Sequence, residues 1–139
     1  MPTQDDDLRR ILTDTGVIAL VGWSPNPDRP SHRVAAFLVS KGYRVIPVNP
    51  GQAGAMALGE VVRASLSDIT EPVDMVDIFR RSSEVGIVVD EALRLQPRVK
   101  VIWMQLGVED ATAADKARAA GVDVVMNRCP AIDIPRLGL

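Results

Sequence analysis

The stretch VGWSPNPDRPSHR, residues 21–33, connects an apolar run before it with a helical pattern after it. In nucleotide-binding α/β proteins, this first connection carries the phosphate-binding loop. Here it contains one glycine, Gly22, and three prolines, and it lacks the G-x-G-x-x-G pattern of dinucleotide-binding domains. Gly22 allows a sharp turn, the prolines reduce the loop entropy that binding removes, and Asp28 or Ser31 is expected to cap the helix. The stretch is either a plain connection stiffened by prolines or a phosphate-binding loop of unusual composition.

On both sides of this loop, short apolar runs alternate with helical patterns. The runs are rich in β-branched residues and several are almost continuously apolar, as in strands covered on both faces. They predict strands at residues 17–22, 43–48, 73–79, 100–106 and 122–127. Helices are predicted at residues 31–41, 82–95 and 110–120, after an amphipathic helix at about residues 5–15. The alternation predicts an α/β fold, a single Rossmann-like domain over residues 1–139 with a parallel sheet and helices on both faces.

The segment from Gly51 to Asp68 has the least regular pattern. We expect a loop there, with an edge strand near residues 60–63 and a short turn of helix around residues 67–69. No repeat, linker or low-complexity tract interrupts the sequence, so we assign this segment to the same domain.

The composition excludes several classes of protein. The chain has 139 residues, 47% of them apolar, and its formal net charge of −2 provides no global positive field for nucleic acid. One cysteine, Cys129, and one histidine, His32, cannot provide an internal disulfide or a metal cluster built from these residue types. The acidic N-terminus is unlike a signal peptide, and no apolar run has the roughly 20 residues of a membrane span. We expect a cytoplasmic protein that binds a small-molecule ligand and neither nucleic acid nor a membrane.

The residues directly after each predicted strand are candidate binding residues, because ligands of open parallel sheets bind beyond the carboxyl ends of the strands. In chain order these ends carry Gly22-Trp23-Ser24-Pro25, Asn49-Pro50, Arg80-Arg81, Gln105-Leu106-Gly107 and Arg128-Cys129. Arg29 and Arg33 lie near the start of the following helix, whose free N–H groups also attract anions. A chain of net negative charge that gathers cations at one edge is predicted to bind a polyanionic ligand there.

The position after the second predicted strand bears on the type of nucleotide. NAD-binding domains usually place Asp or Glu there to hold the ribose hydroxyls. Here the sequence reads Val48-Asn49-Pro50-Gly51, so no carboxylate repels a phosphorylated ribose. No basic residue follows Asn49 closely enough to favour NADP. An NAD(P)-binding Rossmann domain of an oxidoreductase or redox sensor stays as the alternative function.

Several motifs together resemble one family. The string VGWSPNPDRPSHRVAAFLVSKGYRVIPVNP, residues 21–50, is followed by EPVDMVDIFRR, VIWMQLGV and VVMNRC. In this order they are similar to the small bacterial CoA-binding domain proteins, which are relatives of the N-terminal CoA-binding domain of succinyl-CoA synthetase α-subunits. The similarity extends from about Val17 to Leu137. The resemblance implies a Rossmann-like domain that holds the 3′-phospho-ADP part of coenzyme A or an acyl-CoA.

The resemblance also implies a set of cofactor-binding residues that follow strands or begin a helix. Gly22, Trp23, Ser24 and Pro25 would line the diphosphate, and Arg29, Ser31 and Arg33 would lie near the phosphates at the helix start. Asn49 and Pro50 would flank the adenosine, Phe79 and Arg80 would border the far side, and Gln105 would lie near the pantetheine. Arg128, after the last predicted strand, completes the predicted set.

No group of residues predicts a catalytic site. His32 falls in a first helical turn, whereas the phosphorylated histidine of succinyl-CoA synthetases belongs to a second domain that has no counterpart among these residues. Asp74 and Asp77 lie three apart in a predicted strand and so point to opposite faces. We interpret them as structural, with Asp77 bonded to nearby loop backbone. The sequence favours binding without catalysis and leaves open whether the chain catalyses a reaction.

The sequence also predicts roles for its one cysteine and its two tryptophans. Cys129 follows Arg128, and it either packs as a small side chain or forms a mixed disulfide with the CoA thiol. Trp23 either walls the ligand or packs on the helix after the loop. Trp103, inside a predicted strand, is expected to be part of the core.

Overall fold

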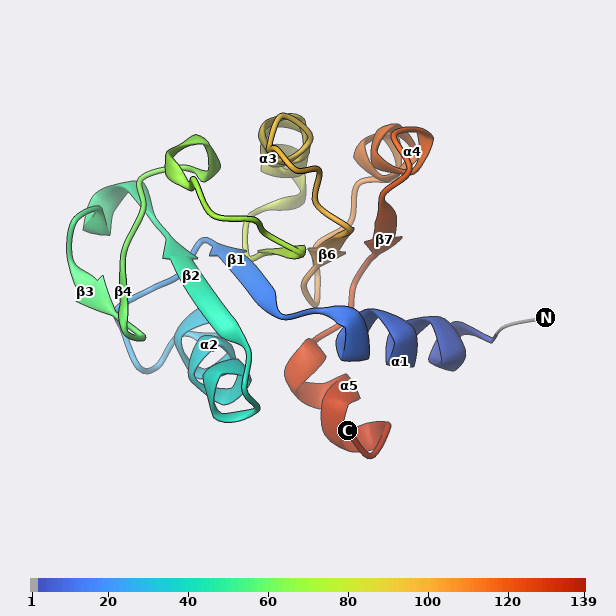
Figure 1. The fold of residues 1–139 in the computed structure, drawn as a ribbon, viewed down its shortest axis with the longest axis horizontal. Helices are drawn as coiled ribbons and strands as arrows, with labels where there is room; N and C mark the ends of the chain where they lie inside the picture. The colour runs from blue at the N-terminus through green and yellow to red at the C-terminus, as the bar shows by residue number, and fades with distance from the viewer. Residues whose placement is uncertain (1–2) are drawn as a thin grey trace.

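Five parallel strands form the central sheet of the computed structural model, which describes residues 3–139 (Figure 1). They are β1 (Val17–Val21), β2 (Arg44–Val48), β5 (Met75–Ile78), β6 (Val101–Met104) and β7 (Asp123–Val125), in the order β2-β1-β5-β6-β7. Every residue of β5 and β6 is buried, because helices cover both faces, and apart from Asp77 their residues are correspondingly apolar. The predicted α/β class with a parallel sheet is confirmed. The first two residues of the predicted 1–139 domain lie outside the described range.

Helices lie on both faces of the sheet (Figure 1). One face carries α1 (Gln4–Asp14), α2 (Pro30–Ser40) and α5 (Pro130–Arg136), and the other carries α3 (Val85–Ala92) and α4 (Ala111–Ala119). Each layer encloses its own apolar core: Leu8, Leu38 and Trp103 belong to the first, and Val89 and Ile102 to the second. Between residues 3 and 139, no helix is both long and apolar enough to cross a membrane.

Two helices differ from the sequence expectation. The predicted helix at residues 82–95 divides into a 3-10 turn, η3 (Ser82–Glu84), and the shorter α3, which ends at Ala92. The helix α5 is absent from the prediction because its two prolines, Pro130 and Pro135, argue against a helix. Pro130 occupies the first helical position, where a proline is tolerated because no intrahelical bond needs its N–H.

The irregular segment after β2 covers the outer edge of that strand. Two short strands, β3 (Met56–Ala57) and β4 (Glu60–Val61), pair with each other as an antiparallel hairpin, and two 3-10 turns, η1 (Pro50–Gln52) and η2 (Leu66–Asp68), flank them. Arg63 pairs with the main sheet through an isolated parallel bridge to Val48. The edge strand expected near residues 60–63 is thus divided between this hairpin and the bridge.

Four charged side chains hold this segment against the start of β2. Arg44 pairs with Glu60 at 2.9 Å and with Glu71 at 2.7 Å, and Arg63 pairs with Glu71 at 2.9 Å. The cluster lies at the amino end of β2, so it fixes the hairpin without taking part in the opposite, carboxyl edge of the sheet.

Candidate functional site

The strand order reverses between β1 and β5. From β1 the chain passes through α2 to β2 on one side, and it later returns to β5 on the other side of β1. The two crossovers therefore leave from opposite faces and open a crevice at the carboxyl ends of the strands. A cleft of about 520 Å³ occupies this place. Its lining consists of Gly22, Trp23, Ser24, Arg29, Pro30, Ser31, Asn49, Phe79, Arg80, Arg81, Gln105, Leu106 and Val108.

A second depression, of about 660 Å³, lies between α1 and the edge strand β7. Its charged side chains include Arg10, which already pairs with Asp7 at 3.8 Å and Asp123 at 3.1 Å. The lining also includes Glu109 and Arg118, so its three carboxylates outnumber its two guanidinium groups and the depression does not attract an anion. The cleft at the strand reversal is the better candidate site.

Most of the residues predicted from the sequence meet in the cleft at the strand reversal. Nine of the thirteen line it: Gly22, Trp23, Ser24, Arg29, Ser31, Asn49, Phe79, Arg80 and Gln105. The other four, Pro25, Arg33, Pro50 and Arg128, are not part of the lining. The guanidinium group of Arg33 donates to the backbone oxygen of Asp28 at 2.7 Å, and that of Arg128 binds the carboxylate of Asp133 at 2.8 Å. Both groups are used to hold local structure.

Four lining residues are additional to the predicted set: Pro30, Arg81, Leu106 and Val108. Arg81 and Leu106 were candidates as residues that follow predicted strands, but the set of cofactor-binding residues left them out. Leu106 is a large apolar side chain that stays 54% exposed beside the cleft. An exposed apolar side chain next to three arginines suits a ligand with both an anionic and an apolar part.

Gly22 brings the ends of three strands together. Its N–H donates to the carbonyl of Val48 at the end of β2, and the N–H of Phe79 donates to Val21 at the end of β1. The backbone of Gly22 has φ +90°, and a Cβ there would collide with the carbonyl of Phe79. Glycine is therefore required for the approach of β1 to β5, as well as for the sharp turn that the sequence predicts.

Asn49 ties two walls of the cleft to each other. Its side-chain N–H donates to the carbonyl of Trp23 at 2.6 Å, and its Oδ1 accepts the N–H of Gly51 at 2.8 Å. The amide thus joins the end of β2 to the loop after β1. Because the amide is neutral and its Oδ1 already accepts the N–H of Gly51, this side chain does not provide the carboxylate with which an Asp or Glu holds ribose hydroxyls.

The start of α2 faces the cleft without a side-chain cap. Arg29 is the N-cap residue, Pro30 is the first helical residue, and no side chain bonds the free N–H groups. The expectation that Asp28 or Ser31 caps this helix is therefore wrong. Ser31 is instead 5% exposed and lines the cleft. Pro30 has no N–H, and those of His32 and Arg33 donate to the carbonyl of Arg29, so in this turn the N–H of Ser31 is the donor that remains for an anion.

The charge of the cleft is positive. Arg29, Arg80 and Arg81 line it, and the lining contains no carboxylate. Arg80 is partly neutralised by Glu84, whose carboxylate lies 2.7 Å from its Nε. The arginines and the positive end of the α2 dipole together favour an anionic ligand.

Two polar atoms at the cleft are buried and lack a hydrogen-bond partner within residues 3–139. They are the indole N–H of Trp23 and the Oε1 of Gln105. Both side chains are 5% exposed. Unpaired buried polar groups are costly, so a ligand or water that bonded them would be stabilised in this position.

Trp23 also packs on α2, one of its two expected roles. Its ring stacks on that of His32, with the ring centroids 5.9 Å apart and the planes inclined by 28°. Trp103 is a core residue, as expected: it is fully buried and its indole N–H donates to the carbonyl of Arg128 at 2.8 Å.

The two aspartates of β5 differ in their environments. Asp74 accepts the N–H groups of Gly16 and Val17, each at 2.9 Å, which agrees with a structural role. Asp77 is fully buried, and neither of its oxygens has a hydrogen-bond partner among residues 3–139, so the expected bond to loop backbone is wrong. In the sheet register its neighbours are Leu20 and Trp103, and burial among them raises the pKa of the Asp77 carboxyl well above its usual value.

Cys129 lies away from the cleft lining. It is the N-cap residue of α5, 6% exposed, and its side chain belongs to the core between α5 and the sheet. This environment favours the packing role over a mixed disulfide, because a reactive thiol must be accessible.

The fold and the cleft define a single α/β domain that presents a cationic ligand site at the reversal of its strand order. Residues 16–135 match the CoA binding domain family, and the chain belongs to this family.

Relatives of known sequence or structure cover nearly the whole chain. It is 36% identical over 123 residues to the uncharacterized protein YneT of Bacillus subtilis (strain 168), a match that covers 88% of each protein. A solved structure from Thermus thermophilus, cell-free ID.343, is 37% identical with a TM-score of 0.91, over 97% of this chain and 99% of that one. A hypothetical protein from Pyrococcus horikoshii OT3 is 36% identical with a TM-score of 0.90, over 99% and 94%.

Proposed function

We propose that the cleft binds coenzyme A or an acyl-CoA through its 3′-phospho-ADP moiety, and that the domain binds without catalysing a reaction. The observation that carries this proposal is the lining of the cleft, which combines three arginines with the uncapped start of α2 and contains no carboxylate. In a chain that belongs to the CoA binding domain family, this chemistry fits a ligand with several phosphates.

Different parts of the ligand suit different walls. The diphosphate fits the turn at Gly22 and the N–H of Ser31, with the guanidinium of Arg29 beside them. The pantetheine arm alternates amide and apolar groups, which matches the adjacent Gln105 and Leu106. In this arrangement an amide N–H of the arm donates to the Oε1 of Gln105, which otherwise has no partner in the described chain.

The same observations argue against NAD as the ligand. NAD-binding domains hold the ribose diol with a carboxylate after the second strand. Asn49 stands there, and both ends of its amide are bonded to Trp23 and Gly51. No other residue of the lining is acidic. The ribose diol would find no carboxylate acceptor in the cleft.

The absence of acid–base groups from the lining supports binding alone. Histidine, cysteine, aspartate and glutamate are all missing from the thirteen residues that line the cleft. Ser24 and Ser31 line the cleft, but a serine hydroxyl is a weak nucleophile without an adjacent general base, and the lining provides none of these side chains as a base. We therefore assign a role as a carrier, a sensor or a subunit that presents CoA.

Thermal unfolding with a panel of ligands tests the proposal. CoA, acetyl-CoA, NAD, NADP and ATP are compared at equal concentration. A ligand at one hundred times its Kd adds about 2.7 kcal/mol of stability, which raises the Tm of a domain of this size by about 8 °C. We expect this shift with CoA and acetyl-CoA and a much smaller one with NAD. Stabilisation by NAD or NADP without stabilisation by CoA would reverse the assignment to the alternative, an NAD(P)-binding domain.

A further inference from the structure

His32 holds the loop that forms one wall of the cleft. Its Nδ1 lies 3.0 Å from the carbonyl oxygen of Ser24, and its ring stacks on that of Trp23. Trp23 and Ser24 both line the cleft, whereas His32 lies behind them on the first turn of α2. The imidazole thus contacts two consecutive wall residues from the side that faces away from the ligand.

The chemistry of this contact determines the tautomer of the imidazole. A carbonyl oxygen can only accept a hydrogen bond, so Nδ1 must carry the proton that it donates to Ser24. The other nitrogen, Nε2, is then the one that carries the second proton in an imidazolium. Protonation at Nε2 keeps the bond to Ser24 and strengthens it, because an imidazolium is a charged donor. It also places a cation against the ring of Trp23.

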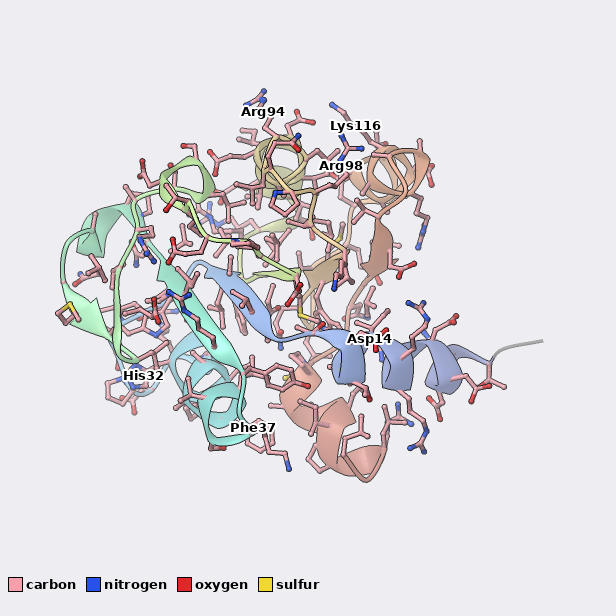
Figure 2. All side chains as sticks on the ribbon, in the orientation of Figure 1. Asp14, His32, Phe37, Arg94, Arg98 and Lys116 are labelled. Atoms are coloured by element: carbon pink, nitrogen blue, oxygen red, sulfur yellow. The ribbon has the colours of Figure 1, made fainter. Side chains whose placement is uncertain are left out.

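Other charged groups near the imidazole do not neutralise such a cation. In its own segment, Arg33 is bonded to backbone oxygens, and the carboxylate of Asp28 does not come within ion-pair distance of the imidazole. On the hairpin after β2, Glu60 pairs with Arg44 and Arg63. Across residues 3–139, His32 makes no ion pair with a carboxylate. Figure 2 also shows it far from Arg94, Arg98 and Lys116, which lie on the α3–α4 face.

A cation at this place is coupled to an anion in the cleft. The first turn of a helix is the positive end of its dipole, and it disfavours a further positive charge. A phosphate bound at the same end compensates both charges. Protonation of His32 and binding of an anionic ligand therefore favour each other, by the reciprocity of linked equilibria.

We propose that His32 is a proton-dependent positioning residue: it fixes the wall formed by Trp23 and Ser24, and in its imidazolium form it strengthens the binding of an anionic ligand in the cleft. The second half of this statement rests on the proposed function. The first half rests on the contact with Ser24 and Trp23 alone, so the two halves can be tested separately.

Nuclear magnetic resonance of the ligand-free protein tests the contact. His32 is the only histidine in the chain, so a protein without a histidine tag gives one set of imidazole signals. Long-range ¹H–¹⁵N correlation above about pH 8 distinguishes the two neutral tautomers. We expect the Nδ1-protonated form, which is the minor one in free histidine. A predominant Nε2-protonated form would overturn the positioning role, whatever ligand the cleft binds.

Calorimetric titration with dephospho-CoA tests the coupling. This probe lacks the 3′-phosphate, a monoester whose second pKa of about 6 would confuse the result, and its diphosphate does not titrate between about pH 5.5 and 8. We expect the wild-type affinity to rise about threefold from pH 8 to pH 5.5, the effect of one partly screened charge.

Two variants separate the hydrogen bond from the charge. His32→Asn retains a side-chain N–H donor near the position of Nδ1, so it should bind as the wild type does at pH 8 but lose the increase at pH 5.5. His32→Phe retains the stacking but not the donor, so it should bind more weakly at both pH values. Circular dichroism and thermal unfolding establish that both variants are folded.

The outcomes distinguish this proposal from the function it builds on. An unchanged pH dependence in His32→Asn would overturn the charge coupling, and wild-type affinity in His32→Phe would overturn the positioning role. If neither CoA nor dephospho-CoA binds the wild type at any pH, the proposed function and the coupling both fail. In that case the tautomer measured by nuclear magnetic resonance still tests the hydrogen bond between His32 and Ser24.

Discussion

The carbonyl of Phe79 occupies the space in which a side chain at Gly22 would begin. This contact joins the ends of β1 and β5, the two strands between which the order of the sheet reverses. The turn at Gly22 therefore lies close to the far wall of the cleft, and both residues line it. The geometry of the candidate site depends on this one missing Cβ.

Gly22→Ala should destabilise the fold and abolish binding. Alanine at φ +90° costs about 1 kcal/mol, and the collision with Phe79 raises the total to about 3 kcal/mol, because a backbone carbonyl cannot move aside cheaply. Urea unfolding measures the change. The matched control is Gly42→Ala, which has φ +96° but nothing within 4 Å of its Cβ, and which should cost only about 1 kcal/mol. Equal losses in the two variants would contradict the role of Phe79.

Arg80→Ala should weaken CoA binding about tenfold, the effect of losing one charge-assisted contact to a phosphate. Glu84→Gln should strengthen binding about twofold, because the carboxylate 2.7 Å from Arg80 competes with the ligand for this guanidinium. Calorimetric titration measures both changes. Arg98, on the α3–α4 face (Figure 2), bonds the carbonyl of Ala120, and Arg98→Ala should leave the affinity unchanged. The same affinity in Arg80→Ala and wild type would remove Arg80 from the site.

Asp77→Asn should change how stability depends on pH. Burial raises the pKa of this carboxyl well above the value of 3.8 that it has when exposed. Between these two pKa values the folded state holds one proton more than the unfolded state. The contribution of Asp77 to the free energy of unfolding is therefore fully present below about pH 4 and is lost as the pH rises. The decrease can reach about 1.4 kcal/mol per pH unit. Asparagine does not titrate, so urea unfolding at pH 5, 7 and 9 should show that the free energy of unfolding of the wild type falls relative to that of the variant as the pH rises. The same pH dependence of the free energy of unfolding in both proteins would contradict this prediction.

Glu71→Gln should change the pH dependence of stability in the opposite sense to Asp77→Asn. A hydrogen bond from its own backbone, together with Arg63 and Thr70, lowers the pKa of Glu71 to about 2, from 4.5. Its contribution to stability is therefore present above about pH 4.5 and is lost as the pH falls towards 2. The variant should be less stable than the wild type at pH 6 and equal to it at pH 2, by urea unfolding. Asp115→Asn, at an 81% exposed side chain, serves as the control and should have no effect at either pH.

The sheet could be predicted from the sequence because its strands are short, apolar and separated by helical patterns. These features depend on local periodicity and on burial from both sides, which a single sequence displays. The helix α5 could not be predicted from the sequence, because its two prolines are tolerated only in their particular positions within the helix.

The candidate site could be predicted in part. Residues after strands meet in any parallel sheet, which explains why Asn49, Phe79 and Gln105 line one cleft. Arg128 also follows a strand, but β7 is at the edge of the sheet, two strands away from β5, and the strand order is not visible in the sequence. Arg33 was predicted to lie near the phosphates but does not line the cleft, for a different reason. It lies two residues after Ser31 on the same helix, and residues with this spacing point in nearly opposite directions.

The amide of Asn49 has a consequence for attempts to change the cofactor of this domain. Engineering of dinucleotide specificity commonly introduces an acidic residue after the second strand. Here an aspartate would remove the N–H that joins this position to the carbonyl of Trp23, and it would place two acceptors 2.6 Å apart. The wall of the cleft would open before a new ribose contact could form. Fitting NAD to this cleft would therefore require rebuilding the loop after β1 together with the end of β2.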